Sequence, residues 1–162
     1  MVCWTKLSGE LFYMEEKEYW SEPRLAWFIR KSTNGDVPFF SNDGKKLYFI
    51  SDLDDKIWYI ETTGKWTEPI PLQMELEGEQ LHWQFSFSTI GTLYFTATVD
   101  DGKGGYGRYD IYRSEYINNK YRRPELLGVQ INTSESDLAP FIAPDESYLI
   151  FSSARPGGFG RT

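Results

Sequence analysis

Three polar residues precede successive apolar runs of this chain and are the first places to look for chemistry: Asp36, His82 and Asp137. His82 is the single histidine, so a site within one chain has at most one imidazole. An imidazole can activate a serine nucleophile, but the sequence has no G-x-S-x-G turn to present that serine. We therefore predict no catalytic residue and keep these three side chains as candidates for ligand binding.

Two acidic clusters beside turns raise the question of metal binding. Asp52, Asp54 and Asp55 form the first cluster, and Asp100 and Asp101 form the second. A calcium loop needs oxygen ligands at fixed offsets and a distal bidentate carboxylate, and neither stretch has that spacing. We interpret these carboxylates as solvated turn residues and predict no metal and no cofactor.

A glycine-rich stretch, residues 102–107, has the composition of a phosphate-binding loop. Such a loop opens a helix and usually carries Lys-Ser or Lys-Thr after its glycines. Here the strand-like run Asp110-Ile111-Tyr112 follows instead. The stretch therefore predicts a hairpin loop.

Length, charge and cysteine content limit the classes of protein that fit this sequence. The 162 residues suit one domain with a sizeable core, and 17% of them are aromatic. The formal charge of −7 argues against a nucleic-acid-binding surface and leaves basic or neutral partners open. No apolar run approaches the roughly 18 residues of a membrane span. Cys3 is the only cysteine, which excludes an intrachain disulfide.

The elements that must position the candidate residues recur along the chain. Residues 37–69 contain three or four short apolar runs separated by turn residues, the pattern of an antiparallel meander. Matching residues recur 46 or 56 positions apart: Trp20 and Trp66, Phe39 and Phe85, Leu47 and Leu93, Leu93 and Leu149. The repeat predicts that most of the chain consists of copies of one four-stranded unit.

A four-stranded repeat of about 46 to 56 residues is the sequence signature of a β-propeller. Its apolar runs do not alternate with polar residues, which predicts strands covered on both faces, as in a blade between two neighbouring blades. No segment has a long helical period with caps. We predict an all-β β-propeller of four-stranded antiparallel blades, with about three blade-equivalents: the last strands of a blade and a connection in 1–36, blades in 37–82 and 83–136, and the first strands of a truncated blade in 137–162.

Counting strands gives two before residue 37, then four, four and two. Three blade-equivalents are too few for an ordinary closed ring. We therefore expect the chain to be a piece of a longer propeller. The alternative is a homodimer about a twofold axis, in which strands in Pro140–Ser153 of each copy complete a blade with Leu11–Glu22 of the other and so close a six-bladed ring.

Several of these repeats resemble a known family. Residues 39–49 and 141–158 resemble the P-x-F-S-P-D-G-K-x-L-x-F core of WD40-like propeller repeats of the TolB type. Trp20-Ser21-Glu22-Pro23 and Trp66-Thr67-Glu68-Pro69 resemble the W-S-x-P ending common in that family. The chain departs from the pattern where Ser88-Thr89-Ile90-Gly91 replaces Ser-Pro-Asp-Gly and where Glu146 stands in place of Gly44. Since glycine readily adopts positive φ, we expect those two turns to differ in type from the first.

The resemblance implies a non-enzymatic propeller scaffold that binds a protein or another extracellular ligand in the periplasm or cell envelope. The alternative is the propeller portion of a larger peptidase or glycan-active enzyme, whose catalytic residues lie outside this chain. The connection into the innermost strand of a blade lies near the central opening of a propeller. Asp36, His82 and Asp137 are in or beside that connection, so we predict that a ligand on the propeller axis meets these residues.

Overall fold

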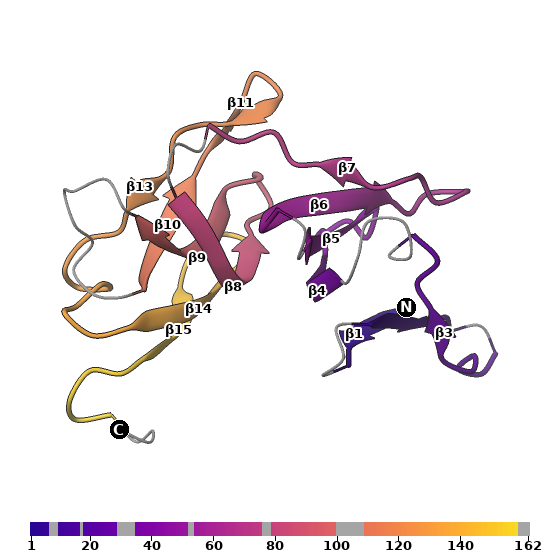
Figure 1. The fold of residues 1–162 in the computed structure, drawn as a ribbon, viewed down its shortest axis with the longest axis horizontal. Helices are drawn as coiled ribbons and strands as arrows, with labels where there is room; N and C mark the ends of the chain where they lie inside the picture. The colour runs from indigo at the N-terminus through magenta and orange to yellow at the C-terminus, as the bar shows by residue number, and fades with distance from the viewer. Residues whose placement is uncertain are drawn as a thin grey trace. The chain divides into compact units, whose positions relative to one another are not determined.

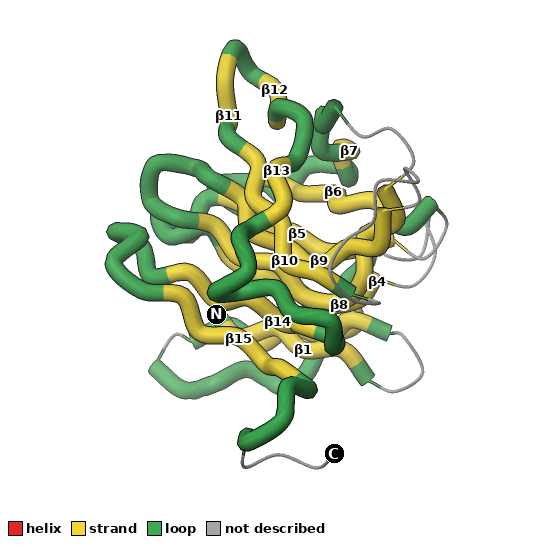
Figure 2. The backbone as a smooth tube through the Cα atoms, turned by 90° about the vertical axis from the view of Figure 1, so that its left-hand side faces the viewer, coloured by secondary structure: helices red, strands yellow, loops and turns green. Residues whose placement is uncertain are grey.

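A computed structural model of the chain describes residues 1–6, 10–16, 18–28, 35–51, 54–75, 79–99 and 109–158. All regular structure in these residues is β-strand, and Figure 2 draws no helix among them. The predicted all-β class is therefore confirmed for the described part of the chain, where no helix is long and apolar enough to cross a membrane. Contacts divide the chain into two compact units, Met1–Leu72 and Gln73–Thr162, which we describe separately.

The first unit consists of two antiparallel sheets (Figure 1). One sheet has the order β1-β2-β3, with β1 at Val2–Thr5, β2 at Leu11–Met14 and β3 at Arg24–Leu25. The other has the order β4-β5-β6-β7, with β4 at Gly35–Phe40, β5 at Lys46–Ser51, β6 at Lys56–Glu61 and β7 at Ile70–Pro71. The second sheet is a complete four-stranded meander, as the spacing of its apolar runs predicts.

The core of the first unit joins its two sheets. Its fully buried residues come from both segments: Leu11, Ala26, Phe28, Leu47, Phe49 and Ile60. The ring of Trp66 lies 4.9 Å from that of Tyr13 and 5.9 Å from that of Phe28. Tyr48, on the opposite face of β5 from Leu47 and Phe49, is also buried. Both faces of β5 are therefore covered, which explains why its apolar run does not alternate.

The second unit contains another four-stranded meander with the order β13-β10-β9-β8. Its strands are β8 at Glu79–Phe87, β9 at Leu93–Val99, β10 at Asp110–Ser114 and β13 at Glu125–Leu126. A hairpin of β11 (Tyr116–Ile117) and β12 (Lys120–Tyr121) is inserted between β10 and β13 and projects from the sheet (Figures 1 and 2). A further sheet pairs β14 (Asp137–Ile142) with β15 (Leu149–Ser153).

The same stacking relation occurs in both units. In the first unit, β4 lies against β1 and β2 of the preceding sheet. In the second, β14 lies against β8 and β9 of the preceding sheet. The β4–β7 sheet and the β14–β15 sheet therefore each meet the preceding sheet of their own unit through their first strand.

The junction between the third and fourth strands is repeated three times. A proline directly precedes the fourth strand in each case: Pro23 before β3, Pro69 before β7 and Pro124 before β13. Before each proline, one backbone N–H closes the turn: Ser21 donates to the Glu15 carbonyl at 2.9 Å, Thr67 to Glu61 at 3.2 Å, and Arg122 to Glu115 at 2.9 Å. The aromatic-x-x-Pro repeat thus specifies one local structure.

Strands β4, β8 and β14 each contain a β-bulge in the same place. The next strand contains a leucine that pairs with Phe40, Phe87 or Ile142 of the bulged strand. Three residues before that pair, a residue other than glycine has positive φ: Val37 at 52°, Gln84 at 76° and Ala139 at 59°. This register corrects the sequence alignment by one residue. Phe87 pairs with Leu93 as Phe40 pairs with Leu47, so Ser86, and not Phe85, is the equivalent of Phe39.

The turn that follows the first strand has a residue with positive φ at its fourth position in all three copies. The residues with positive φ are Gly44 at 68°, Gly91 at 91° and Glu146 at 60°. Their N–H groups donate to the carbonyl oxygens of Ser41, Ser88 and Ala143 at 2.8, 3.1 and 2.9 Å. The expectation that the departures from the family pattern change the turn is wrong for the third copy, because Glu146 adopts the left-handed conformation that glycine adopts elsewhere. In the second copy the hairpin is one residue shorter, because the Ser88 N–H donates to the Thr92 carbonyl, whereas those of Ser41 and Ala143 donate to Lys46 and Tyr148.

The N-terminal sheet has one strand more than the sequence comparison indicates. Strand β1 pairs with β2 through Val2 and Met14, Cys3 and Tyr13, and Trp4 and Phe12. It takes the place that β5 has beside β6. The sheet therefore supplies the second, third and fourth strands of a four-stranded unit, and not only the last two.

Candidate functional site

Two of the three candidate residues occupy equivalent positions in bulged first strands. Asp36 pairs with Ile50, and His82 pairs with Thr96. Asp137 is displaced by one residue, because it is Leu138 that pairs with the corresponding Ser152. Since side chains alternate between faces of a strand, Asp137 and Leu138 point to opposite faces.

Asp36 forms a hydrogen bond within its own strand. Asp36 is exposed, and its carboxylate accepts a 2.7 Å hydrogen bond from the N–H of Val37, the residue with positive φ in the bulge. The His82 side chain lies outside the described residues. Asp36 belongs to the first unit and His82 to the second, so a shared site stays a prediction.

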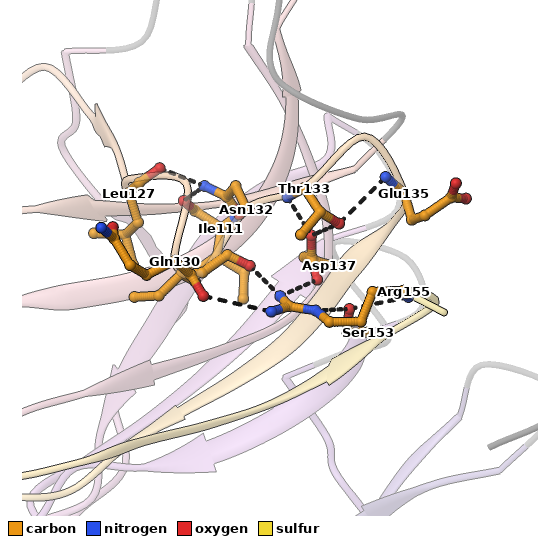
Figure 3. Close-up of polar contacts among 10 residues, drawn as sticks. Ile111, Leu127, Gln130, Asn132, Thr133, Glu135, Asp137, Ser153 and Arg155 are labelled. Atoms are coloured by element: carbon orange, nitrogen blue, oxygen red, sulfur yellow. Dashed lines mark hydrogen bonds and ion pairs between the residues drawn. The ribbon is translucent and has the colours of Figure 1, made fainter. Parts of the chain in front are cut away.

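Asp137 is completely buried and its carboxylate is already bound within the chain (Figure 3). One oxygen accepts hydrogen bonds from the Thr133 N–H at 2.7 Å and from the Thr133 hydroxyl at 2.9 Å. The other accepts from Nη2 of Arg155 at 2.9 Å. Burial by itself raises the pKa of a carboxyl, but hydrogen bonds from Ser153, Arg155 and Thr133 outweigh it and lower the pKa of Asp137. The carboxylate therefore stays ionised at neutral pH.

Arg155 ties the end of β15 to the turn before β14. Besides binding Asp137, its guanidinium donates to the carbonyl oxygens of Ile131 at 2.5 Å and Gln130 at 3.4 Å. Its Nε donates to the Ser153 hydroxyl at 2.7 Å, and the guanidinium carbon lies 5.2 Å from the centre of the Phe151 ring. These contacts hold two backbone carbonyls and two side chains of β15 in place.

Asn132 extends the same polar cluster into the neighbouring sheet. Its side-chain oxygen accepts from the Ile111 N–H at 2.8 Å, and its amide donates to the Ile111 carbonyl at 2.9 Å and to the Leu127 carbonyl at 2.8 Å (Figure 3). Asn132 is buried, so these three bonds satisfy an amide that water does not reach. We name Asn132, Thr133, Asp137, Ser153 and Arg155 the Asp137–Arg155 cluster.

The Asp137–Arg155 cluster has the chemistry of a structural joint. Its charged groups are paired with each other, and its other polar groups bind backbone groups or side chains within the cluster. A ligand that bound Asp137 would have to displace Arg155 or Thr133. Sequence reasoning singled out Asp137 but not Arg155; the available signal was the Ser-x-Arg-Pro-Gly-Gly stretch that follows the repeat.

The acidic clusters are described only in part. Asp54 accepts from Nε1 of Trp58 at 3.1 Å and from the Lys56 N–H at 3.3 Å, the contacts of a turn residue. Asp52, Asp100 and Asp101 lie outside the described residues, as does the glycine-rich stretch 102–107. Within the described ranges, no three acidic, histidine or cysteine side chains gather as they would around a metal ion.

A comparison with known proteins finds no matching family model and no matching curated protein. The resemblance to TolB-type repeats therefore stays a prediction. What the chain does has to be argued from its own repeated geometry.

Proposed function

We propose that this chain is part of a non-enzymatic β-propeller scaffold, similar to the TolB-type WD40-like repeats, that binds a protein or another extracellular ligand. The observation that carries the proposal is the repeated unit of the two four-stranded meanders. Both have the same strand order, the same bulge in the first strand and the same proline junction before the fourth. A recurring four-stranded antiparallel meander is also the repeating unit of a propeller, which supports the proposal.

The stacking of first strands gives further support. Within the first unit β4 lies against the sheet before it, and within the second unit β14 does the same, so these two sheets meet their neighbours near their own first strands. A radial arrangement of blades brings first strands together around an axis. Scaffolds of this shape hold their ligands with loops and strand ends near that axis, and the scaffold itself does not define the ligand.

The proposed ligand contacts are Asp36 and His82, at the start of equivalent first strands. Asp137 joins them only if its bonds to Arg155 and Thr133 are given up. The net charge of −7 favours a basic or neutral partner. A setting in the periplasm or cell envelope follows from the family resemblance alone.

The test combines capture and turnover. The purified chain is immobilised and exposed to an extract of cell-envelope proteins, alongside an Asp36→Ala/His82→Ala variant and an Asp54→Ala/Glu68→Ala control that removes other acidic groups. We expect the first variant to lose the captured partner and the control to keep it. Equal capture by both variants contradicts the proposed contacts. Turnover of generic ester, peptide or glycoside substrates that disappears in His82→Gln contradicts the non-enzymatic assignment.

A further inference from the structure

The N-terminal sheet has a second apolar face, opposite the core of the first unit. Cys3 and Tyr13 pair across β1 and β2 and pack on the core. Trp4 and Phe12 are the next pair, so they point to the other face, where their rings stack with centroids 5.9 Å apart. Val2 and Met14 pair on the same face, and the Val2 side chain is 46% exposed.

This face repeats an interface that the chain itself forms. In the β4–β7 sheet the equivalent positions are Leu47, Phe49, Trp58, Ile60 and Trp66, and all five pack into the core between the two sheets of the first unit. Trp66 covers Tyr13 and Phe28 there. Its counterpart 46 positions earlier, Trp20, is 47% exposed. We name Val2, Trp4, Phe12, Met14 and Trp20 the Trp4 face.

The sheet of β14 and β15 has an exposed apolar face that corresponds to the Cys3–Tyr13 side of the N-terminal sheet. Phe141 pairs with Ile150, and Tyr148 lies two residues before Ile150, so the three share one side of this sheet. They are 46%, 59% and 54% exposed, in that order. Ile150 is the register equivalent of Cys3, which packs on the β4–β7 sheet in the interface of the first unit. We name these three residues the Ile150 face.

We propose that two copies of this chain associate head to tail, with the Trp4 face of one packed on the Ile150 face of the other. The contact would continue the sheet-on-sheet packing already present within residues 1–72, because each face is equivalent to one half of that interface. A pair in which this contact forms in both directions leaves neither face open. The inference depends on this packing and on the strand register, not on the proposed ligand.

The register also decides how the copies meet. A shared blade would need a strand of the partner beside β2, but β2 already has β1 on one edge and β3 on the other. The completion of a blade by strand exchange, which strand counting suggested, is therefore blocked unless β1 leaves. Packing of one sheet face on the other leaves all of these pairs intact.

Sedimentation velocity from micromolar to millimolar concentration tests the association. We expect a monomer–dimer equilibrium that Ile150→Arg weakens at least about tenfold, because a charge is introduced into the centre of the contact. Trp20→Arg should weaken it similarly. The matched control is Ile90→Arg, at a turn residue that is 79% exposed and belongs to neither face, which should leave the dimer unchanged. Circular dichroism and thermal unfolding verify that each variant is folded.

Mixing the two variants distinguishes head-to-tail from like-to-like pairing. A homodimer of either variant has both contacts damaged, whereas a mixed dimer has one intact contact, between Trp20 of the first chain and Ile150 of the second. We expect the mixture to dimerise more strongly than either variant alone. A monomer at every concentration overturns the proposal. So does a dimer that ignores both substitutions or shows no recovery on mixing.

Discussion

At the scale of single residues, two arginine–carboxylate ion pairs have the same N–O distance but differ in how far they are buried. Arg155 binds Asp137 and Arg113 binds Glu125, each with an N–O distance of 2.9 Å. The first carboxylate is completely buried, while the second pair is exposed on both sides. The two pairs are therefore a matched set for testing what burial adds to an ion pair.

Replacing Arg155 should destabilise the chain far more than replacing Arg113. Arg155→Ala leaves a buried carboxylate with only part of its hydrogen bonds, which costs about 1–3 kcal/mol. Arg113→Ala removes an exposed pair, for which about 0–1 kcal/mol is expected. Urea unfolding of both variants measures the difference. Equal losses would mean that the Asp137–Arg155 cluster does not form as described.

The Asp137 carboxylate should also make stability depend on pH. Its pKa is lowered in the folded chain, despite burial, by hydrogen bonds from Ser153, Arg155 and Thr133. Its stabilisation is therefore fully present above the unfolded value of about 3.9 and is lost as pH falls through the lower folded value. The difference in unfolding free energy between the wild type and Asp137→Asn should be constant above about pH 5 and shrink below about pH 4. A difference that stays constant into strong acid contradicts this assignment.

Cys3 offers a chemical test of the strand that sequence comparison missed. Burial raises the pKa of its thiol to about 12, and the thiolate is the reactive form. At pH 8 the folded chain should react with a disulfide reagent about a thousandfold more slowly than the chain in urea. Rapid labelling of the native chain would show that β1 does not stay paired with β2.

At the scale of elements, the three turns after the first strands allow a reciprocal experiment. Glu146 has φ at 60°, where a side chain costs about 1–2 kcal/mol, partly offset by the backbone entropy that glycine loses. Because the Glu146 side chain also hydrogen-bonds Tyr94, the comparison is with Glu146→Ala, which loses the same bond, and Glu146→Gly should be the more stable of the two by about 0.5–1 kcal/mol. Gly44→Ala should destabilise it by about 1 kcal/mol, since nothing lies within 4 Å of an added Cβ and only the backbone is strained. Thermal unfolding in which alanine is as stable as glycine at either position would contradict the shared turn geometry.

The strands themselves were largely predictable because their signals are local. The apolar runs around Leu47, Leu93 and Leu149 fall on β5, β9 and β15. The proline junctions likewise mark β3, β7 and β13. The extra residue in β8 was not predictable, since a bulge absorbs it without changing the apolar pattern. Strand β1 was missed because its match to β5 is displaced by one residue.

The contacts of the candidate site were less predictable than the strands. The polar positions Asp36, His82 and Asp137 can be found from the repeat, but the repeat does not say which of them is already satisfied. Arg155 reaches Asp137 across 18 positions of sequence, through the bulged pairing of β14 with β15. Such a contact depends on the register of the two strands, because a shift of one residue turns a side chain to the opposite face of the sheet.

At the scale of the whole molecule, the repeat predicts one buried phenylalanine in the second strand of three sheets: Phe49, Phe95 and Phe151. Phe49 and Phe95 fulfil this prediction, as both are buried opposite an aromatic residue, Trp58 or Tyr112. Phe151 does not, since it is half-buried beneath the guanidinium of Arg155. Among the described strands β15 has one pairing partner, whereas β5 and β9 each have two.

Truncating the three phenylalanines should therefore give unequal losses of stability. Phe49→Ala and Phe95→Ala each open a cavity in a closed core, at a cost of about 3–5 kcal/mol. Phe151→Ala should cost about 1–2 kcal/mol, because much of its ring already meets solvent or the Arg155 side chain. Urea unfolding of the three variants, at one concentration below any dimerisation, provides the comparison. If Phe151→Ala costs as much as Phe95→Ala, the Phe151 face of β15 is as closed in solution as the core around Phe95, and the half-buried position beneath Arg155 is wrong.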